Sequence, residues 1–524
     1  MKTRNILLIA VAAVCTLASC SKLLDIPQKG VLNFETYYQT DEEIQAAAIP
    51  MYSTLKGNAY YFKLAKEMFT DDVYCGGSAR NDNIDLEKMN EYTFDAEESY
   101  IQGMFEALYS IIYRANVILG HVDEGYSDLA KQIRAEAKVF RAYSYFELIT
   151  MWGNPPVVDH ELAPSEYNVP NGSTEELWAL VETDLTEALA SGKLAQKSSL
   201  NDRECWKVTQ QFAQALLGKA YLWMATALND NSYYAKSAAQ FDAVVSSEKY
   251  DLYPGEYSQL RRDKHNCEII FSSNTIHDDN NVWNNMSMFD LMVGWRSDRM
   301  YYGTCPLATY SWGFRIPRKG LYEAFVADEG EDGYRLNETL KTYAQIQELW
   351  GAGENAGDSM ICDGYFFFKQ QAYQDDVEPG SMGFANVCDL IWMRYAEVLL
   401  CGAEAHFKAG NNSKDKAQEY VDKIRARAGL ASVPVTMDVI KTEKRLELCA
   451  EGTRFQDLLR WGEAYEAMKD NGSTYPVMTS NGEVTYQSCG NSSYGFKQGK
   501  NERLPYPATE IRLNNAIEQN PGWE

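Results

Sequence analysis

The chain has 524 residues, of which 45% are hydrophobic and 23% are charged, a composition typical of packed globular proteins and not of disordered or collagen-like chains. The length permits several domains or one large unit. The 49 basic and 74 acidic side chains give a formal net charge of −25, which argues against a surface that follows a nucleic-acid backbone. The 35 Tyr and 11 Trp residues exceed what a core needs, and aromatic side chains in loops usually indicate contact with a ligand.

The first residues have the pattern of a secretory signal. A short basic start at Met1–Arg4 precedes the apolar run Ile6–Ala13, which is too short to cross a bilayer as a permanent helix. The Leu-Ala-Ser-Cys sequence that ends at Cys20 resembles a lipobox, in which a signal peptidase cleaves before a Cys that carries lipid. We therefore expect residues 1–19 to be a lipoprotein signal peptide and Cys20 to be the lipid-attachment residue. No later segment has ~18 consecutive apolar residues, so the body of the protein is expected outside the lipid.

Long helical patterns dominate two blocks of the chain, at about 131–250 and 390–468. Apolar residues recur at helical spacing from Ile133 to Met151, and the Trp-Gly-Asn-Pro-Pro sequence that follows is expected to end that helix. Ser173 and Glu176 have the spacing of a capping box at the start of the next helix. Further helices are predicted at about 209–228, 235–246, 391–409, 414–428, 438–450 and 453–468.

The other stretches are rich in Tyr, Trp, Asn, Asp and Gly and have weak periodicity. They cover about 21–130, 250–390 and 470–505, and loops of this length in a compact domain are generally functional. No linker rich in Pro or Ser separates the blocks. Residues 20–524 are therefore expected to form one unit, with a loop-rich half packed on a helical half.

Two of the predicted helix pairs resemble tetratricopeptide repeats. In the first pair, Gly218 lies in the pattern of the first helix, and Ser237 and Phe241 fall at the small and bulky positions of the second. In the second pair, Ala403 and Ala417 occupy corresponding small positions. A generic amphipathic hairpin would give the same spacing. The predicted fold class is mostly α, with a scaffold of tetratricopeptide-like helical hairpins and a loop-rich ligand-binding half.

Motifs of known catalytic and metal chemistry are missing from the sequence. It contains no His-Glu-x-x-His, Gly-x-Ser-x-Gly or Walker A sequence, and its five His residues are far apart. The segment Asn81–Asp85 alternates oxygen-bearing side chains but lacks the Gly and the distal Glu of a calcium loop. Glu447 and Glu451 lie one helical turn apart among Arg residues, where a structural ion network is favoured over glycoside hydrolysis. We expect no catalytic residue, no metal and no cofactor.

Five blocks in order along the chain resemble the SusD/RagB family of nutrient-binding lipoproteins. The first is R-A-E-A-K-V-F-R-A-Y at Arg134–Tyr143, which continues to the Trp-Gly-Asn-Pro-Pro sequence. The third contains E-G-T-R-F-Q-D-L-L-R-W-G at Glu451–Gly462. The second block is 393–405 with 424–430, the third also includes 443–448, and the fourth and fifth are 504–507 and 519–523.

The resemblance implies a mostly helical SusD-like protein, anchored by lipid at the cell surface in the outer membrane of a Bacteroidetes-type bacterium. The implied function is capture of a glycan or oligosaccharide without catalysis, and its delivery to a TonB-dependent transporter of the SusC type, over which the protein sits as a hinged lid. The matching blocks fall mainly in the helical scaffold, so they define fold and partner better than substrate. Two alternatives keep the same fold: capture of peptide or another nutrient, or a mainly structural role as a lid.

Ligand contacts are expected from aromatic and polar residues of the loop-rich half. A pyranose ring presents a face of C–H groups that stacks on an indole or phenol ring, while its hydroxyls need amides, carboxylates or Arg. The alternative is that these aromatic side chains pack the loop-rich half. The candidate ligand-binding residues are Trp283, Trp295, Tyr301, Tyr302, Tyr310 and Trp312 in one stretch, and Asp72, Tyr74, Arg80, Asn81 and Tyr92 in an earlier one.

Overall fold

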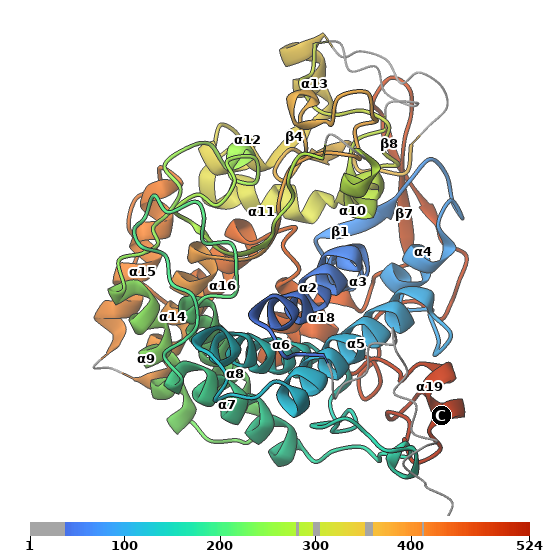
Figure 1. The fold of residues 1–524 in the computed structure, drawn as a ribbon. Helices are drawn as coiled ribbons and strands as arrows, with labels where there is room; N and C mark the ends of the chain where they lie inside the picture. The colour runs from blue at the N-terminus through green and yellow to red at the C-terminus, as the bar shows by residue number, and fades with distance from the viewer. Residues whose placement is uncertain (1–36, 279–281, 297–303, 352–359, 411–412) are drawn as a thin grey trace, which may run out of the picture.

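The structure is a computed structural model that describes residues 37–278, 282–296, 304–351, 360–410 and 413–524. These residues form a predominantly helical protein, and short strands occur mainly in the part of the molecule around α10–α13 (Figure 1). In the parts of the chain that the structure describes, no helix combines the length and the apolar character needed to cross a membrane.

The N-terminal third is built from helices, most of which begin at a residue whose side chain caps the helix. Thr40 and Glu43 form a capping box at the start of the first described helix, and the Ser127 side chain accepts a hydrogen bond from the Ala130 amide. These helices are α2 (Asp41–Gly57), α3 (Ala59–Met68), α4 (Ile84–Glu91), α5 (Ser99–His121) and α6 (Asp128–Trp152). The predicted end of α6 is confirmed, since the helix stops at Trp152 and Gly153 follows with φ 85°.

The segment 21–130 was expected to be rich in loops, but its described part consists largely of helices. Helix α5 has an apolar stripe that includes Ile101, Phe105 and Leu108, all of which are buried. Tyr, Asn and Gly residues interrupt this stripe in the sequence and conceal its helical period. Packing against α6 and α2 stabilises the helix, because tertiary burial outweighs the weak local signal.

The middle of the chain forms the first of the predicted helical hairpins. Helices α8 (Gln210–Ala227) and α9 (Ser232–Ser246) form this hairpin, and α7 (Thr174–Ala190) precedes it. The predicted Ser173 capping box is present at the start of α7. A Cβ at Gly218 would lie 2.8 Å from Phe241 Cζ, so only a glycine lets α8 and α9 approach this closely. The Ser237 hydroxyl donates to the Gly218 carbonyl at 2.7 Å and holds the pair together.

The second predicted hairpin packs against the first. It consists of α14 (Tyr395–Ala409) and α15 (Lys414–Arg427), and α14 also contacts α9. The hairpin is followed by α16 (Met437–Glu447), α17 (Arg454–Trp461), α18 (Ala464–Met468) and α19 (Ala508–Leu513). The helix predicted at 453–468 is divided in two, because Gly462 adopts the left-handed conformation that ends a helix.

The strands form four antiparallel pairs, each of two strands, in the described residues. The pairs are β1 (Val73–Gly76) with β3 (Phe314–Pro317), β2 (Ile269–Ser273) with β6 (Leu390–Arg394), β4 (Leu340–Thr342) with β5 (Tyr365–Phe367), and β7 (Thr474–Met478) with β8 (Val484–Ser488). The segments between them contain α10 (Met288–Val293), α11 (Lys319–Glu329), α12 (Tyr334–Thr339) and α13 (Tyr343–Trp350).

The start of the helix predicted at 391–409 is wrong. Its first residues belong to strand β6, where Leu390 pairs with Ser273 and Arg394 pairs with Ile269. Pairing with a strand that lies more than a hundred residues earlier decides this conformation, and the local sequence carries no signal of that partner.

One large apolar core extends from Ile44 to Ile517 and joins the helical blocks to the rest of the molecule. A smaller cluster around Trp295, Phe366 and Met478 lies in the part that contains α13 and the strand pair β4 and β5. The smaller cluster supports the loops that precede β3.

Candidate functional site

Strand pairing brings the two stretches of predicted ligand residues together. β1 follows Asp72 and pairs with β3, so that Gly76 lies opposite Phe314. The pairing continues beyond the strands, because the Gly77 amide donates to the Gly313 carbonyl at 3.0 Å. The loop after β1 and the loop before β3 therefore lie side by side, although more than 200 residues separate them in the sequence.

Two aromatic side chains of the later loop are exposed beside this junction. The side chains of Tyr310 and Trp312 are 60% and 43% exposed. The Arg296 guanidinium donates to the Trp312 carbonyl at 2.8 Å and lies 3.3 Å from a carboxylate oxygen of Asp82 on the earlier loop. We call the surface formed by Ser78, Asp82, Arg296, Tyr310 and Trp312 the Trp312 surface. It combines aromatic faces with charged and hydroxyl groups.

Glycines permit the close approach of these loops. Gly77 has φ 89°, and a Cβ there would lie 2.9 Å from Asp82 Oδ2. Gly313 has φ 71°, and a Cβ there would lie 2.5 Å from Arg296 Cγ. Both positions are in the left-handed region that favours glycine. Replacing either residue would move Asp82 or Arg296 relative to Trp312.

The segment Asn81–Asp85, which follows β1 and has oxygen-bearing side chains, makes local hydrogen bonds. Asp82 Oδ2 accepts from the amide and the hydroxyl of Ser78 at 2.7 and 2.8 Å. Asn83 caps α4 by accepting from the Leu86 amide at 3.1 Å. The Asn81 amide donates to the buried carboxylate of Glu87, and Asn81 has φ 65°. Within the described ranges, no group of three or more His, Cys, Asp or Glu side chains is placed to hold a metal ion.

Three of the aromatic candidates lie in the interior. Trp295, Tyr74 and Tyr92 are between 0% and 4% exposed. The Trp295 indole donates to the Phe367 carbonyl at 2.8 Å, and the Tyr92 hydroxyl donates to the Phe69 carbonyl at 2.6 Å. A ring with these partners has no free face for a sugar. Composition alone does not separate such packing rings from exposed ones, because both occur in segments of weak periodicity.

Asp72 and Arg80 are engaged in ion pairs. Asp72 is buried and lies 2.6 Å from the Arg445 guanidinium and 3.2 Å from that of Arg454. It therefore ties β1 to the C-terminal helices. Arg80 pairs with the buried carboxylates of Glu87 and Glu91, while about a quarter of its side chain remains accessible.

The remaining candidates lie outside the described residues. These are Tyr301 and Tyr302, the side chain of Trp283, and Cys20. Sequence reasoning missed Asp82 and Ser78 as parts of the exposed surface. The signal was the Gly76-Gly77 pair, which marks a backbone position with positive φ directly after a strand.

The paired carboxylates of the C-terminal helices belong to a buried ion network. Glu451 lies 2.7 Å from the Arg394 guanidinium and also pairs with Lys369. Burial alone would raise the pKa of the Glu451 carboxyl, but Arg394 and Lys369 outweigh burial and lower the pKa to about 2. Glu447 pairs with Arg394 at 2.6 Å and with Arg427, and its pKa is likewise held below the usual range. Both carboxylates are bound to cations; Glu447 is buried, and the Glu451 side chain is 11% exposed.

Comparisons with known families agree with the order of the sequence blocks. Residues 364–523 match the model described as "SusD family", and residues 33–222 match the model described as "Starch-binding associating with outer membrane". A SusD-like protein of Formosa agariphila is 24% identical over 99% of this chain and 98% of its own length. The starch-binding protein SusD of Bacteroides thetaiotaomicron is 26% identical over 40% of this chain and 37% of its own length.

Solved structures show the same fold. A structure described as a laminarin-binding SusD-like protein has a TM-score of 0.74 and 26% identity, and the match covers 92% of this chain and 99% of the other. The surface glycan-binding protein A from Bacteroides thetaiotaomicron, in complex with laminarihexaose, has a TM-score of 0.73 and 22% identity over 92% of this chain and 99% of the other.

Proposed function

The chain belongs to the SusD family, and from this premise we propose that it captures a glycan at the Trp312 surface and delivers it to a transporter in the outer membrane. As a member of this family it is a binding protein and not an enzyme. The observation that carries the proposal is the exposure of Trp312 and Tyr310 beside Arg296 and Asp82. Aromatic faces supply stacking for the C–H face of a sugar, and the charged groups supply partners for its hydroxyls.

The substrate class follows from chemistry and from the relatives. The names of the similar proteins mention starch, laminarin and laminarihexaose, all of which are built from glucose units. Glucose units expose the C–H faces that an indole ring accepts. Laminarihexaose is therefore the first probe, followed by a glycan array that includes starch fragments. A peptide library tests the alternative ligand class.

The first prediction concerns Trp312. Trp312→Ala in the chain from residue 21 onward should weaken binding of the glycan by about 1–3 kcal/mol, roughly 5- to 150-fold, because one stacking platform is removed. Isothermal titration calorimetry measures the change, and circular dichroism checks the fold. Tyr167→Ala is the control, since Tyr167 is also an exposed aromatic residue, at 60%, but follows the segment Pro164–Glu166 and is not part of the Trp312 surface. Equal affinity of Trp312→Ala and the parent would overturn the assignment of the site.

The transporter partner has its own test. We propose a TonB-dependent SusC-type protein as the partner, and a lipid anchor at Cys20 that holds this protein at the cell surface beside it. Affinity purification of the tagged full chain from detergent-solubilised outer membranes should recover such a transporter in a defined ratio. Recovery of this protein alone under conditions that preserve other outer-membrane complexes would refute the partnership.

A further inference from the structure

A concave site lies along helix α2. It is a cavity of about 340 Å³ between α2, α6, the segment 206–207 and the end of β2. This volume is at the lower end of the range for small-molecule pockets, roughly 300–1,000 Å³. We call it the α2 pocket. No residue proposed above for glycan binding lines it.

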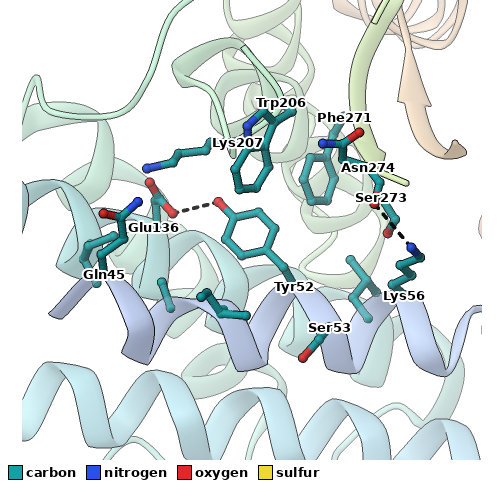
Figure 2. A pocket seen from close by; sticks show the side chains of 14 residues that line it. Gln45, Tyr52, Ser53, Lys56, Glu136, Trp206, Lys207, Phe271, Ser273 and Asn274 are labelled. Carbon is teal, nitrogen blue, oxygen red and sulfur yellow. Dashed lines mark hydrogen bonds between the residues drawn. The ribbon is translucent and has the colours of Figure 1, made fainter. Parts of the chain in front are cut away.

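Three aromatic rings form the middle of the α2 pocket. Figure 2 shows the Tyr52 ring above α2, with Trp206 and Phe271 facing it. The Tyr52 ring centroid lies 5.7 Å from that of Trp206 and 6.4 Å from that of Phe271, both in edge-to-face geometry. Trp206 is 38% exposed and stands at the mouth. The planar ring of a ligand would pack against these three rings in edge-to-face or offset-stacked geometry.

The central ring is fixed before any ligand arrives. The Tyr52 hydroxyl donates to the Glu136 carboxylate at 2.7 Å and accepts from the Val208 amide at 3.1 Å. The other Glu136 oxygen accepts from Gln132 at 2.9 Å. Because both oxygens have partners, Glu136 serves as part of the wall. A pre-organised pocket of this kind loses little conformational entropy on binding.

The polar groups of the pocket lie at its two ends (Figure 2). Gln45, Glu136 and Lys207 are at one end, and Lys56 and Asn274 are at the other. The Lys56 ammonium has three donors, and among the described residues its one hydrogen bond is a long one of 3.4 Å to the Asn274 carbonyl. Two donors therefore remain for an acceptor in the pocket.

This distribution excludes a sugar as the natural occupant. A pyranose ring carries hydroxyls around its whole rim and needs polar partners on all sides. The α2 pocket offers apolar atoms around its middle, from Ala48, Leu55 and Ile133 besides the three rings. Lys56 is the cation at one end, and Lys207 lies with the Glu136 carboxylate at the other. Its chemistry matches a flat apolar body with a terminal anion.

We propose that the α2 pocket binds a small aromatic carboxylate, whose ring lies among Tyr52, Trp206 and Phe271 and whose carboxylate pairs with Lys56. The Lys56 ammonium loses hydration in this position, and a carboxylate replaces the lost water with charge-assisted hydrogen bonds. The negative net charge of the whole protein opposes the ligand weakly, because charges more than about 8 Å away are screened at physiological salt.

The probe is trans-cinnamate, with cinnamyl alcohol as its neutral counterpart. Isothermal titration calorimetry on the chain from residue 21 onward should show saturable binding of cinnamate at one site, and at least tenfold weaker binding of the alcohol. Lys56→Met keeps the apolar stem and should weaken cinnamate at least tenfold while leaving the alcohol unchanged. Ser53→Phe places a ring in the pocket from an exposed position of α2 and should abolish binding of both.

Controls separate this site from the glycan site. Lys408→Met removes an exposed cation elsewhere on a helix and should bind cinnamate as the parent does. Trp312→Ala should also bind cinnamate normally, and Lys56→Met should bind the glycan normally. No saturable binding of cinnamate, equal affinity in the folded Lys56→Met and Ser53→Phe variants, or displacement of cinnamate by the glycan would each overturn the proposal. The first two results leave glycan capture by the Trp312 surface untouched, whereas displacement by the glycan would also place the glycan in the α2 pocket and contradict that surface.

Discussion

The carboxylate of Glu451 shows how a single residue serves the fold. Its side chain is 11% exposed, and its oxygens meet the guanidinium of Arg394 and the ammonium of Lys369. Arg394 is at the same time paired with Glu268 and Glu447. Removing one member of such a group leaves its buried partners with less counter-charge. The resulting loss of stability exceeds what the ion pair itself contributed.

We expect Glu451→Gln to lower the free energy of unfolding by about 3 kcal/mol or more, because Lys369 then loses its carboxylate partner and Arg394 keeps only Glu268 and Glu447. Urea denaturation followed by circular dichroism measures the change. Glu466→Gln is the control, since the Glu466 side chain is 71% exposed in its pair with Lys469 and should contribute less than about 1 kcal/mol. A loss of stability of equal size in both variants would contradict the structural role of the buried network.

The difference in free energy of unfolding between the parent and Glu451→Gln should also depend on pH. The folded protein holds the pKa of Glu451 at about 2, below the value of 4.5 for an unperturbed Glu. A group with a lowered folded pKa binds fewer protons when folded, so its stabilisation is present above the unfolded pKa and is lost as the pH falls through the folded one. The stability difference should therefore be constant from pH 5 to 8, on the order of several kcal/mol at most, and should shrink between about pH 4.5 and 2. Urea titrations at a series of pH values test this; a difference that grows on acidification has the wrong sign.

At the scale of secondary structure, the two hairpins depend on positions without a side chain. Gly218 of α8 faces Phe241 of α9, and a Cβ at Gly402 of α14 would lie 2.9 Å from Tyr420 of α15. Both hairpins therefore use the same device, a glycine opposite a bulky ring. The sequence carried this signal at Gly218, where small and bulky positions had the spacing of a repeat. In the second hairpin the sequence predicted Ala403 as the small position, which is one residue after Gly402, the glycine that faces Tyr420.

Gly218→Val should lower the free energy of unfolding by about 2 kcal/mol, because its side chain overlaps the buried Phe241 ring and forces α9 outward. Gly120→Val is the matched control on α5, where nothing lies within 4 Å of the added Cβ. There the change should stay within about 0.5 kcal/mol. Differential scanning calorimetry measures the loss of stability in the two variants. An equal loss in both would show that the cost arises from helix propensity and not from the contact with Phe241.

For the whole molecule, the segments that could be predicted from the sequence were those whose apolar residues recur with a helical period. The helices predicted at 209–228 and 414–428 are confirmed as α8 and α15 with ends that differ by one residue. Arg394 was placed in a helix because its strand partner lies far away in the sequence. The exposure of Trp312 and the burial of Trp295 could not be predicted, since both stand in similar polar stretches of sequence. Tertiary contacts separate them: Trp312 lies beside the pairing of β1 with β3, whereas Trp295 packs on β5.

Attachment to the membrane concerns the whole molecule, and lipid attachment at Cys20 stays a prediction. Cys20→Ala should abolish incorporation of a fatty-acid analogue and release the protein from the membrane fraction, because the thiol is the only proposed point of lipid attachment. Metabolic labelling followed by fractionation measures both effects. Cys15→Ala is the control within the same leader and should leave labelling intact. Undiminished labelling of the Cys20 variant would contradict the lipid anchor.

The buried ion network also sets an order of events during synthesis. Glu268 finds its cations at Arg394 and Arg427, which are made more than a hundred residues later. Arg394 in turn needs Glu447 and Glu451. A ribosome-bound chain that ends near residue 390 therefore has a complete first hairpin but no counter-charges for this part of its interior. Such a nascent chain must keep that region hydrated and open, and closure of the core awaits the last fifth of the polypeptide.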